Sequence, residues 1–388
     1  MFLALRDLRF ATGRFALMGS VVALITLLLV MLSGLTGGLG AQSTAALDDL
    51  GEQGTQRIVF GGAAGQAAEA GFTQSEFTLA QRDAWAAADG VSAVEPLGVS
   101  QGRLVGLEHA VALPADAPAG PARVNTDGVP TTGVAAAALL GLQEGSAHLP
   151  AALDAGQIVL SASLSEELGQ GVGGTVASSG VQLSVAAVVP DSFYSHTPVA
   201  WVGTDDWAAL AHADSADVLG TVGLASFDDG ADADATASAA DSAAGTVSTT
   251  VSGAYAALPA YSSEHGSLVM MQGFLYGISA LVVIAFLSIW TVQRTREIAV
   301  LKALGGSTGW VLRDALVQAG IVLALGVAVG TLAAFGLGRL AAAAVPFLSS
   351  AGTTVLPALG VLALGMLGAG LAVARVTRVD PLVALGGS

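Results

Sequence analysis

The stretch LVMMQGFLYGISALVVIAFLSIWTV, residues 268–292, contains no Asp, Glu, Lys or Arg and decides the fold class. A helix needs about 20 apolar residues to cross the hydrocarbon core of a bilayer. Three further uncharged stretches of the chain are long enough to do so. The sequence therefore predicts a polytopic α-helical membrane protein. Its four transmembrane helices are expected at residues 15–43, 265–293, 315–338 and 355–374.

The basic residues predict how these helices are oriented, because Lys and Arg near helix ends are retained on the cytoplasmic side. Nine of the 14 basic residues flank the predicted helices on one side, at Arg6, Arg9, Arg14, Arg294, Arg296, Lys302, Arg313, Arg375 and Arg378. We expect a plasma (inner) membrane protein with both termini in the cytoplasm. Residues 1–14 are then a cytoplasmic amphipathic lead-in, residues 375–388 a cytoplasmic tail, and residues 339–354 an outer connection.

A large extracytoplasmic α+β domain is expected at residues 44–264, inserted between helices 1 and 2, since this segment carries 26 of the 30 acidic residues. Short apolar or alternating runs bounded by Gly or Pro predict strands. They lie at residues 57–60, 91–99, 102–113, 157–160, 172–189, 198–202 and 218–227. Thr78–Ala88 and Ser161–Leu168 predict short helices with Thr or Ser near the N-cap. The stretch 228–250 is either a mobile loop or a solvated helix.

A cleaved signal peptide is the alternative for the N-terminal apolar run. Signal-peptide cores contain 7 to 15 apolar residues. The run here is about twenty residues long, which favours a retained membrane helix.

Several kinds of chemistry are excluded by composition. A P-loop needs Gly-Lys followed by Ser or Thr, but the one lysine, Lys302, is followed by Ala303. The net charge of -16 argues against nucleic-acid binding, and there is no cysteine. We therefore expect no catalytic residue, no metal site and no intrinsic cofactor. The scattered His109, His148, His196 and His212, and the pairs Asp205-Asp206 and Asp228-Asp229, are expected to be solvated surface residues.

The segment QRTREIAVLKALGGS, residues 293–307, continues the second helix out of the membrane and ends at a Gly-Gly stop. It resembles the signature that follows the second membrane helix of FtsX-like and MacB-type ABC transporter permeases. The C-terminal pattern from Arg375 to Leu385, the lead-in Leu5–Arg9 and the unit Ile158–Pro190 are similar to the same family.

The resemblance implies that residues 294–314 couple the permease to a separate cytoplasmic ABC ATPase subunit, which binds ATP and Mg. The contact residues are expected to be Arg294, Arg296, Glu297 and Lys302. The family also implies a homodimer in a 2+2 complex, surrounded by membrane lipids and working by mechanotransmission. Full-length MacB carries a fused N-terminal ATPase that this sequence lacks.

Within the family, the chain is most similar to the haem-exporter permease (HrtB-like) branch, which makes haem the leading candidate for an amphipathic cargo that is exported or extracted from the membrane. The candidate ligand-binding residues are Tyr261, Glu264, His265, Met270, Met271 and Arg339. The alternative is an interfacial belt, because Tyr and His are common at headgroup depth and Met fills packing gaps.

Two other functions remain open at this stage. One is an FtsX-like regulatory protein that signals to a cell-wall hydrolase without transport, and the other is a permease that extrudes lipoproteins or peptides. The spacings Gly34/Gly38 and Gly326/Gly330 allow helices to approach closely, either within the chain or at a dimer interface.

Overall fold

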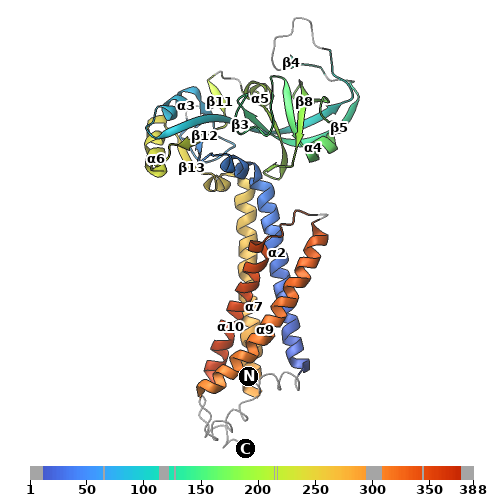
Figure 1. Cartoon of the computed structure of the whole chain (residues 1–388), viewed down its shortest axis with the longest axis vertical. Coiled ribbons are helices and arrows are strands. Elements are labelled where there is room, and N and C mark those ends of the chain that lie inside the picture. The colour runs from blue at the N-terminus through green and yellow to red at the C-terminus, as the bar shows by residue number, and fades with distance from the viewer. Residues whose placement is uncertain are drawn as a thin grey trace, which may run out of the picture. The chain divides into compact units, whose positions relative to one another are not determined.

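The computed structural model describes residues 12–63, 66–112, 122–125, 128–213, 215, 217–293, 308–342 and 345–376. The chain divides into two compact units (Figure 1). The membrane unit comprises Met1–Leu39 and Glu264–Ser388, and the β-rich unit comprises Gly40–Ser263. Of the predicted coupling segment 294–314, residues 294–307, and with them Arg294, Arg296, Glu297 and Lys302, lie outside the described residues, while residues 308–314 form the start of α9.

Four long apolar helices are found among the described residues, as predicted. They are α2 (Thr12–Glu52), α7 (Pro259–Gln293), α9 (Thr308–Ala341) and α10 (Ala351–Val376). By length and composition they could cross a membrane over Phe15–Glu52, Ala260–Phe286, Arg313–Ala341 and Ala351–Ala372. The first helix is longer than its apolar run, because its last residues belong to the β-rich unit. The fourth begins four residues before the expected Val355.

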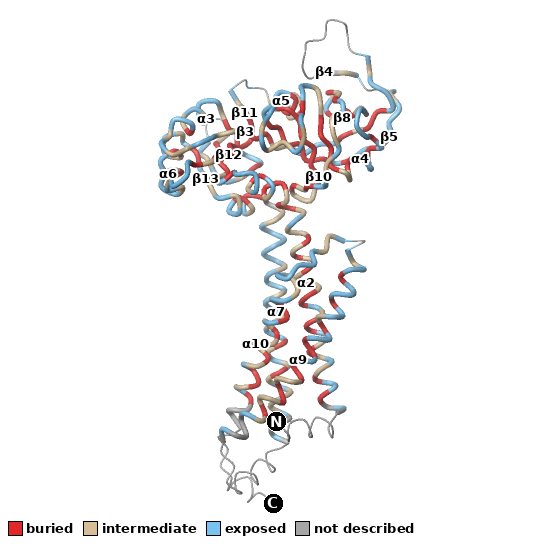
Figure 2. Tube along the Cα trace, in the orientation of Figure 1, coloured by how far each residue is buried: buried red, intermediate tan, exposed pale blue. Residues whose placement is uncertain are grey.

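Gly326 and Gly330 on α9 pack against α2 of the same chain. A Cβ at Gly326 would lie 2.8 Å from the carbonyl oxygen of Gly19, and one at Gly330 would lie 2.8 Å from Cβ of Thr26. Both positions therefore place α9 directly against the backbone of α2. Figure 2 shows buried positions recurring along both helices.

The other glycine pair, on α2, receives the connection between α9 and α10. A Cβ at Gly34 would overlap the ring of Phe347, and one at Gly38 would overlap the backbone of Pro346. The amide of Leu348 donates a hydrogen bond to the carbonyl of Gly34 at 3.0 Å. Both small-residue spacings are thus explained by packing within one chain, and neither supports a dimer interface.

The β-rich unit contains thirteen strands among its described residues and four short α-helices. The strands are β1 (Arg57–Phe60), β2 (Phe77–Thr78), β3 (Val91–Leu107), β4 (Ala122–Arg123), β5 (Thr131–Leu142), β6 (Gln157–Ser161), β7 (Thr175–Ser178), β8 (Val181–Val189), β9 (Phe193–Tyr194), β10 (Thr197–Gly203), β11 (Val218–Gly220), β12 (Val222–Phe227) and β13 (Val247–Thr250). The helices are α3 (Leu79–Ala86), α4 (Ala162–Leu168), α5 (Thr204–Ala211) and α6 (Ala233–Ala244), followed by the 3₁₀ helix η1 (Gly253–Ala257).

Strand β3 organises the main sheet, whose order is β13-β1-β12-β3-β5-β10-β6-β8-β4. Its first part, to Leu97, pairs antiparallel with β12, and its second part, from Gly98, pairs antiparallel with β5. The sequence predicted two runs here, 91–99 and 102–113, but the structure has one continuous strand of 17 residues. Strand β3 therefore belongs to both parts of the sheet, the part that contains β12 and the part that contains β5.

The change of partner on β3 creates a socket for a tryptophan. Gly98 and Gly141 face each other across β3 and β5. A Cβ on either glycine would overlap the side chain of Trp207, which is 5% exposed and comes from α5. The two glycines are required because any larger side chain would exclude the indole from this part of the core.

The predicted helices are confirmed. Thr78 Oγ1 accepts a hydrogen bond from the amide of Gln81, and Gln81 Oε1 accepts one from the amide of Thr78, which forms a capping box at the start of α3. Of the alternatives for residues 228–250, the helix is correct over Ala233–Ala244, whereas Val247–Thr250 form β13, which was not predicted. Asp232 caps α6 by accepting hydrogen bonds from the second and third amides beyond it, and Ala237 and Ala240 are buried.

Candidate functional site

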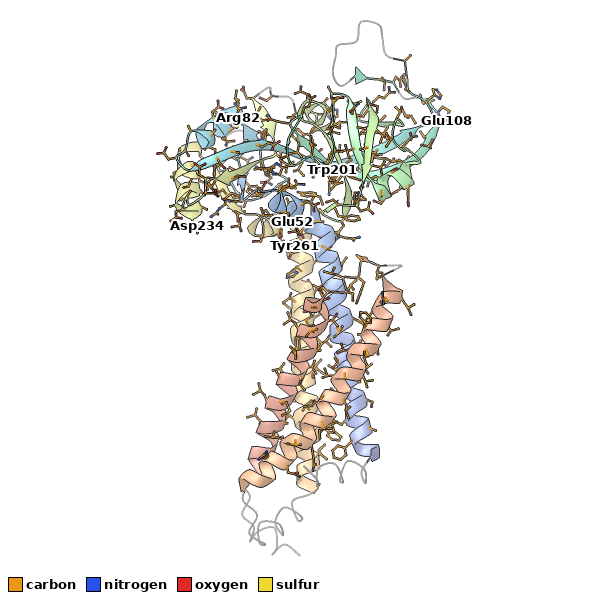
Figure 3. All side chains as sticks on the ribbon, viewed as in Figure 1. Glu52, Arg82, Glu108, Trp201, Asp234 and Tyr261 are labelled. Atoms are coloured by element: carbon orange, nitrogen blue, oxygen red, sulfur yellow. The ribbon has the colours of Figure 1, made fainter. Side chains whose placement is uncertain are left out.

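The candidate ligand residues on α7 fall into two groups. Tyr261 belongs to the β-rich unit, while Glu264, His265, Met270 and Met271 belong to the membrane unit. Figure 3 labels Tyr261 at the start of the helix. The other four are exposed, with Met270 64% and Met271 49% accessible. The two methionines are therefore accessible to lipid or to a ligand.

Helical geometry separates these four residues. With 3.6 residues per turn, Glu264 and Met271 are about two turns apart and share a face of α7. On the same geometry, Met270 lies about 120° around the helix from Glu264 and about 140° from His265. Met270 therefore cannot join His265 on one ligand within a single copy of α7 without a change in the helix.

Arg339, the sixth candidate, is exposed in the last turn of α9. Its guanidinium carbon lies 5.4 Å from the ring centre of Phe335, which is the geometry of a cation–π contact. The described contact of Arg339 is thus with its own helix.

Tyr261 lies in an aromatic and carboxylate cluster that sequence reasoning missed. Its ring packs edge-to-face on Tyr255, with centres 5.7 Å apart. The Tyr255 hydroxyl donates to Asp48 on α2, which also accepts from Thr44 at 3.1 Å. Burial, and then the hydrogen bond to Asp48, raise the pKa of Tyr255 above its usual range. Asp48 and Tyr255 are 207 residues apart, so no spacing in the sequence indicated this pairing.

Two of the four histidines expected on the surface are half-buried and lie against other side chains of the β-rich unit. His148 Nδ1 lies 2.9 Å from Glu95 Oε2, and its Nε2 lies 2.9 Å from the Thr55 hydroxyl. His196 is half-buried, with Nε2 3.0 Å from the Ser43 hydroxyl. His109 and His212 are exposed, as expected.

The row Thr55–His148–Glu95 has the order of a hydrolase triad, in which a carboxylate orients the imidazole and the imidazole activates a hydroxyl. Thr55, however, is 4% exposed. A substrate carbonyl cannot reach a hydroxyl that is enclosed by the protein. The row instead ties the loop after α2 to β3 and to the turn after β5, and the structure gives no support to a hydrolase.

Asp206 was expected to be solvated with Asp205, but it is 1% exposed. The amide of Gly156 donates to its Oδ2 at 2.8 Å, and its Oδ1 has no hydrogen-bond partner among the described residues. Burial raises the pKa of Asp206, the Gly156 hydrogen bond opposes the shift, and the charges of Asp205 and Glu144 add to it. Asp205 itself is exposed, as are Asp228 and Asp229.

No group of three or more His, Asp or Glu side chains that could hold a metal ion occurs among the described residues. In the membrane unit, α2 and α9 line a groove of about 470 Å³ with apolar side chains and the hydroxyl of Ser20. Phe15, Val322, Leu325 and Val329 supply its larger walls. The groove suits an apolar body but supplies no ligand for iron.

Comparison with known proteins identifies the C-terminal part of the chain. Residues 269–381 match the family described as FtsX-like permease C-terminal. A protein of Staphylococcus epidermidis, provisionally named hemin transport system permease protein HrtB, is 29% identical over 130 residues, which cover 34% of this chain and 37% of that protein. Its namesake in Staphylococcus haemolyticus is 31% identical over 130 residues, with the same coverage. The chain thus matches little more than a third of the length of these relatives.

Among solved structures, the periplasmic region of MacB from Actinobacillus actinomycetemcomitans aligns with 51% of this chain and 90% of its own. The TM-score is 0.34 and the sequence identity is 12%. Similarity at this level does not establish a common fold.

Proposed function

Because residues 269–381 match the family described as FtsX-like permease C-terminal, we propose that the chain is the permease subunit of an ABC transporter that exports an amphipathic molecule or extracts it from the membrane. The observation that carries the proposal is this match, which begins in α7 and extends through α9 and α10. Four helices that could span a membrane, grouped around a shared apolar core in the membrane unit, are consistent with it.

ATP hydrolysis is assigned to a separate subunit. This sequence contains one lysine, Lys302, followed by Ala303, so it cannot form a P-loop. The partner ATPase would bind ATP and Mg and would contact the segment 294–314. Arg294, Arg296, Glu297 and Lys302 would supply the charged part of that contact, and closure of the ATPase would move the membrane helices.

Hemin is the proposed cargo because the relatives that match the chain are named as hemin transport permeases. The apolar groove between α2 and α9 supports an apolar or amphipathic cargo that enters from the bilayer. Iron ligands would come from Tyr261, Glu264, His265, Met270 or Met271, with Arg339 near a propionate.

A second copy of the chain is proposed as a further partner. In the most apolar 18-residue stretch of α7, 11% is buried, whereas 39% of the corresponding stretch of α2 is buried. Phe274, Ile278 and Leu281 are all more than half exposed. In a homodimer, this face would be covered by the partner and not by lipid.

Reconstitution with the ATPase into lipid nanodiscs tests the proposal. Hemin should stimulate ATP hydrolysis, and Arg296→Glu with Glu297→Arg should lower the stimulated rate at least tenfold, because it reverses charges at the proposed contact. The matched control is Arg82→Glu with Asp83→Arg, which reverses a neighbouring pair 2.6 Å apart in the β-rich unit. This control should leave the stimulated rate unchanged.

The same preparation separates transport from regulation. Retention of a cell-wall hydrolase partner, with no stimulation by hemin, would replace the export proposal with the FtsX-like regulatory one. Stimulation by a lipoprotein or peptide in place of hemin would retain the permease but change its cargo.

A further inference from the structure

A second groove in the membrane unit lies along α9 and is closed on one side by α10. Its volume is about 550 Å³. The walls are Leu316, Val317, Ile321 and Ala324 of α9 and Met366 of α10. All five side chains are apolar, and Val317, Ile321 and Ala324 follow the three- and four-residue spacing of one face of α9.

Two glycines make this face hollow. At Gly320 a Cβ would lie 3.5 Å from the sulfur of Met366, and at Gly309 a Cβ would have no neighbour within 4 Å. A larger residue at either position would fill the space that the groove occupies.

One end of the groove is positively charged. Arg313 lines it, is exposed, and is the first residue of the candidate span Arg313–Ala341. Arg313 has no ion-pair partner among the residues that the structure describes. An exposed guanidinium at the first residue of a candidate membrane span can bind a phosphate by two parallel hydrogen bonds.

The length of the groove agrees with the depth of one leaflet. Arg313 and Ala324 are eleven residues apart on a continuous helix, which at 1.5 Å per residue is about 16 Å. Half of the hydrocarbon core of a bilayer is about 15 Å. A groove of this length that begins at headgroup depth would end close to the midplane.

We propose that this groove binds an anionic phospholipid, with its phosphate on Arg313 and one acyl chain along Leu316–Ala324 as far as Met366. An apolar groove with an arginine at one end complements a molecule that has an anionic head and an apolar tail. The proposal does not depend on the identity of the cargo, and its test needs neither ATP nor hemin.

Native mass spectrometry of the full chain, released from detergent after titration with phosphatidylglycerol or phosphatidylcholine, measures the binding. The wild type should retain one phosphatidylglycerol in preference to phosphatidylcholine. Arg313→Gln should weaken this binding about fivefold, as expected for one basic residue at an anionic membrane surface. Arg339→Gln is the matched control, because it removes the cation at the other end of the same helix.

A second variant tests the acyl-chain part without changing charge. Ala324→Phe fills the groove from its exposed side and should abolish preferential binding. Ala333→Phe, at an exposed alanine of α9 outside the groove lining, should not. Equal retention of both lipids by the wild type, or equal losses in Arg313→Gln and Arg339→Gln, would overturn the proposal.

Discussion

In the β-rich unit, glycines leave space that a tryptophan fills, whereas in the membrane unit the glycines are themselves the contact surface. Gly98 and Gly141 form a socket for Trp207, so the stabilising free energy comes from burying an indole. Gly326 and Gly330 let α9 touch the backbone of α2. Lipid is as apolar as a helix surface, so close packing has to replace the hydrophobic effect there. The same residue type therefore serves two different sources of stability.

The largest effect is expected from Trp207→Ala. Removing a buried tryptophan leaves a cavity and typically costs 3–5 kcal/mol of unfolding free energy. Hydrogen exchange of the full chain in detergent, followed by mass spectrometry, should show faster exchange in β3 and β5 and no change in α9. Val172→Ala, at a side chain that is 70% exposed, is the control. Faster exchange throughout the chain would show that the two units are not independently stabilised.

A somewhat smaller loss is expected from Gly330→Leu. The new side chain would collide with the backbone of Ala23 and with Thr26, and overpacking a tight contact costs about 1–3 kcal/mol. Thermal unfolding in detergent should begin at a lower temperature. Gly336→Leu changes the same helix at a position with no neighbour within 4 Å and should leave the unfolding temperature unchanged. Equal destabilisation by both variants would attribute the effect to α9 alone and not to its contact with α2.

The two units also differed in how far sequence could predict them. The membrane helices follow from the absence of charge, a signal that depends on composition alone. Strand β5 was missed because its run VAAAALL, residues 134–140, is rich in Ala, which favours helix. It forms a strand since β3 and β10 pair with it on both sides and supply its hydrogen bonds. The secondary structure of this segment is therefore determined by its pairing in the sheet and not by its local helix propensity.

At the candidate site, too, the sequence could not predict contacts that depend on tertiary structure. The coupling role of residues 294–314 was predicted from a local motif and stays a prediction. The cluster of Asp48 with Tyr255, and the row Thr55–His148–Glu95, join residues that only the folded sheet brings together. Burial of Asp206 was missed as well, because the neighbouring Asp205 suggested a solvated pair, and adjacent residues on a helix point in different directions.

Asp206→Asn tests how the β-rich unit tolerates a buried carboxylate. Because burial raises the pKa of Asp206 above 3.8, the folded state binds its proton more tightly than the unfolded state does. The wild type therefore loses stability as pH rises through the interval above 3.8, and the amide variant does not. At pH 7 the variant should be more stable by about 1 kcal/mol, since a neutral amide keeps the Gly156 hydrogen bond and removes an unpaired charge.

The measurement is the unfolding temperature of the full chain at pH 7, 5.5 and 4. The advantage of Asp206→Asn over the wild type should shrink as the pH falls. Asp205→Asn, one residue away and exposed, should show a smaller advantage at every pH. An advantage of Asp206→Asn that stays constant with pH would mean that the change acts through packing and not through ionisation.

The smallest effect concerns the hydrogen bond that joins α7 to α2 inside the membrane unit. Gln272 Nε2 donates to Thr36 Oγ1 at 3.1 Å, and Thr36 donates to the carbonyl of Leu32 at 2.7 Å. Hydrogen bonds between membrane helices contribute about 0.6 kcal/mol on average. A double-mutant cycle with Gln272→Ala and Thr36→Val, read by unfolding in denaturing detergent, should give a coupling energy of about that size. A coupling energy larger than the loss caused by Gly330→Leu would mean that polar contacts, and not glycine-mediated approach of the backbones, hold the membrane unit together.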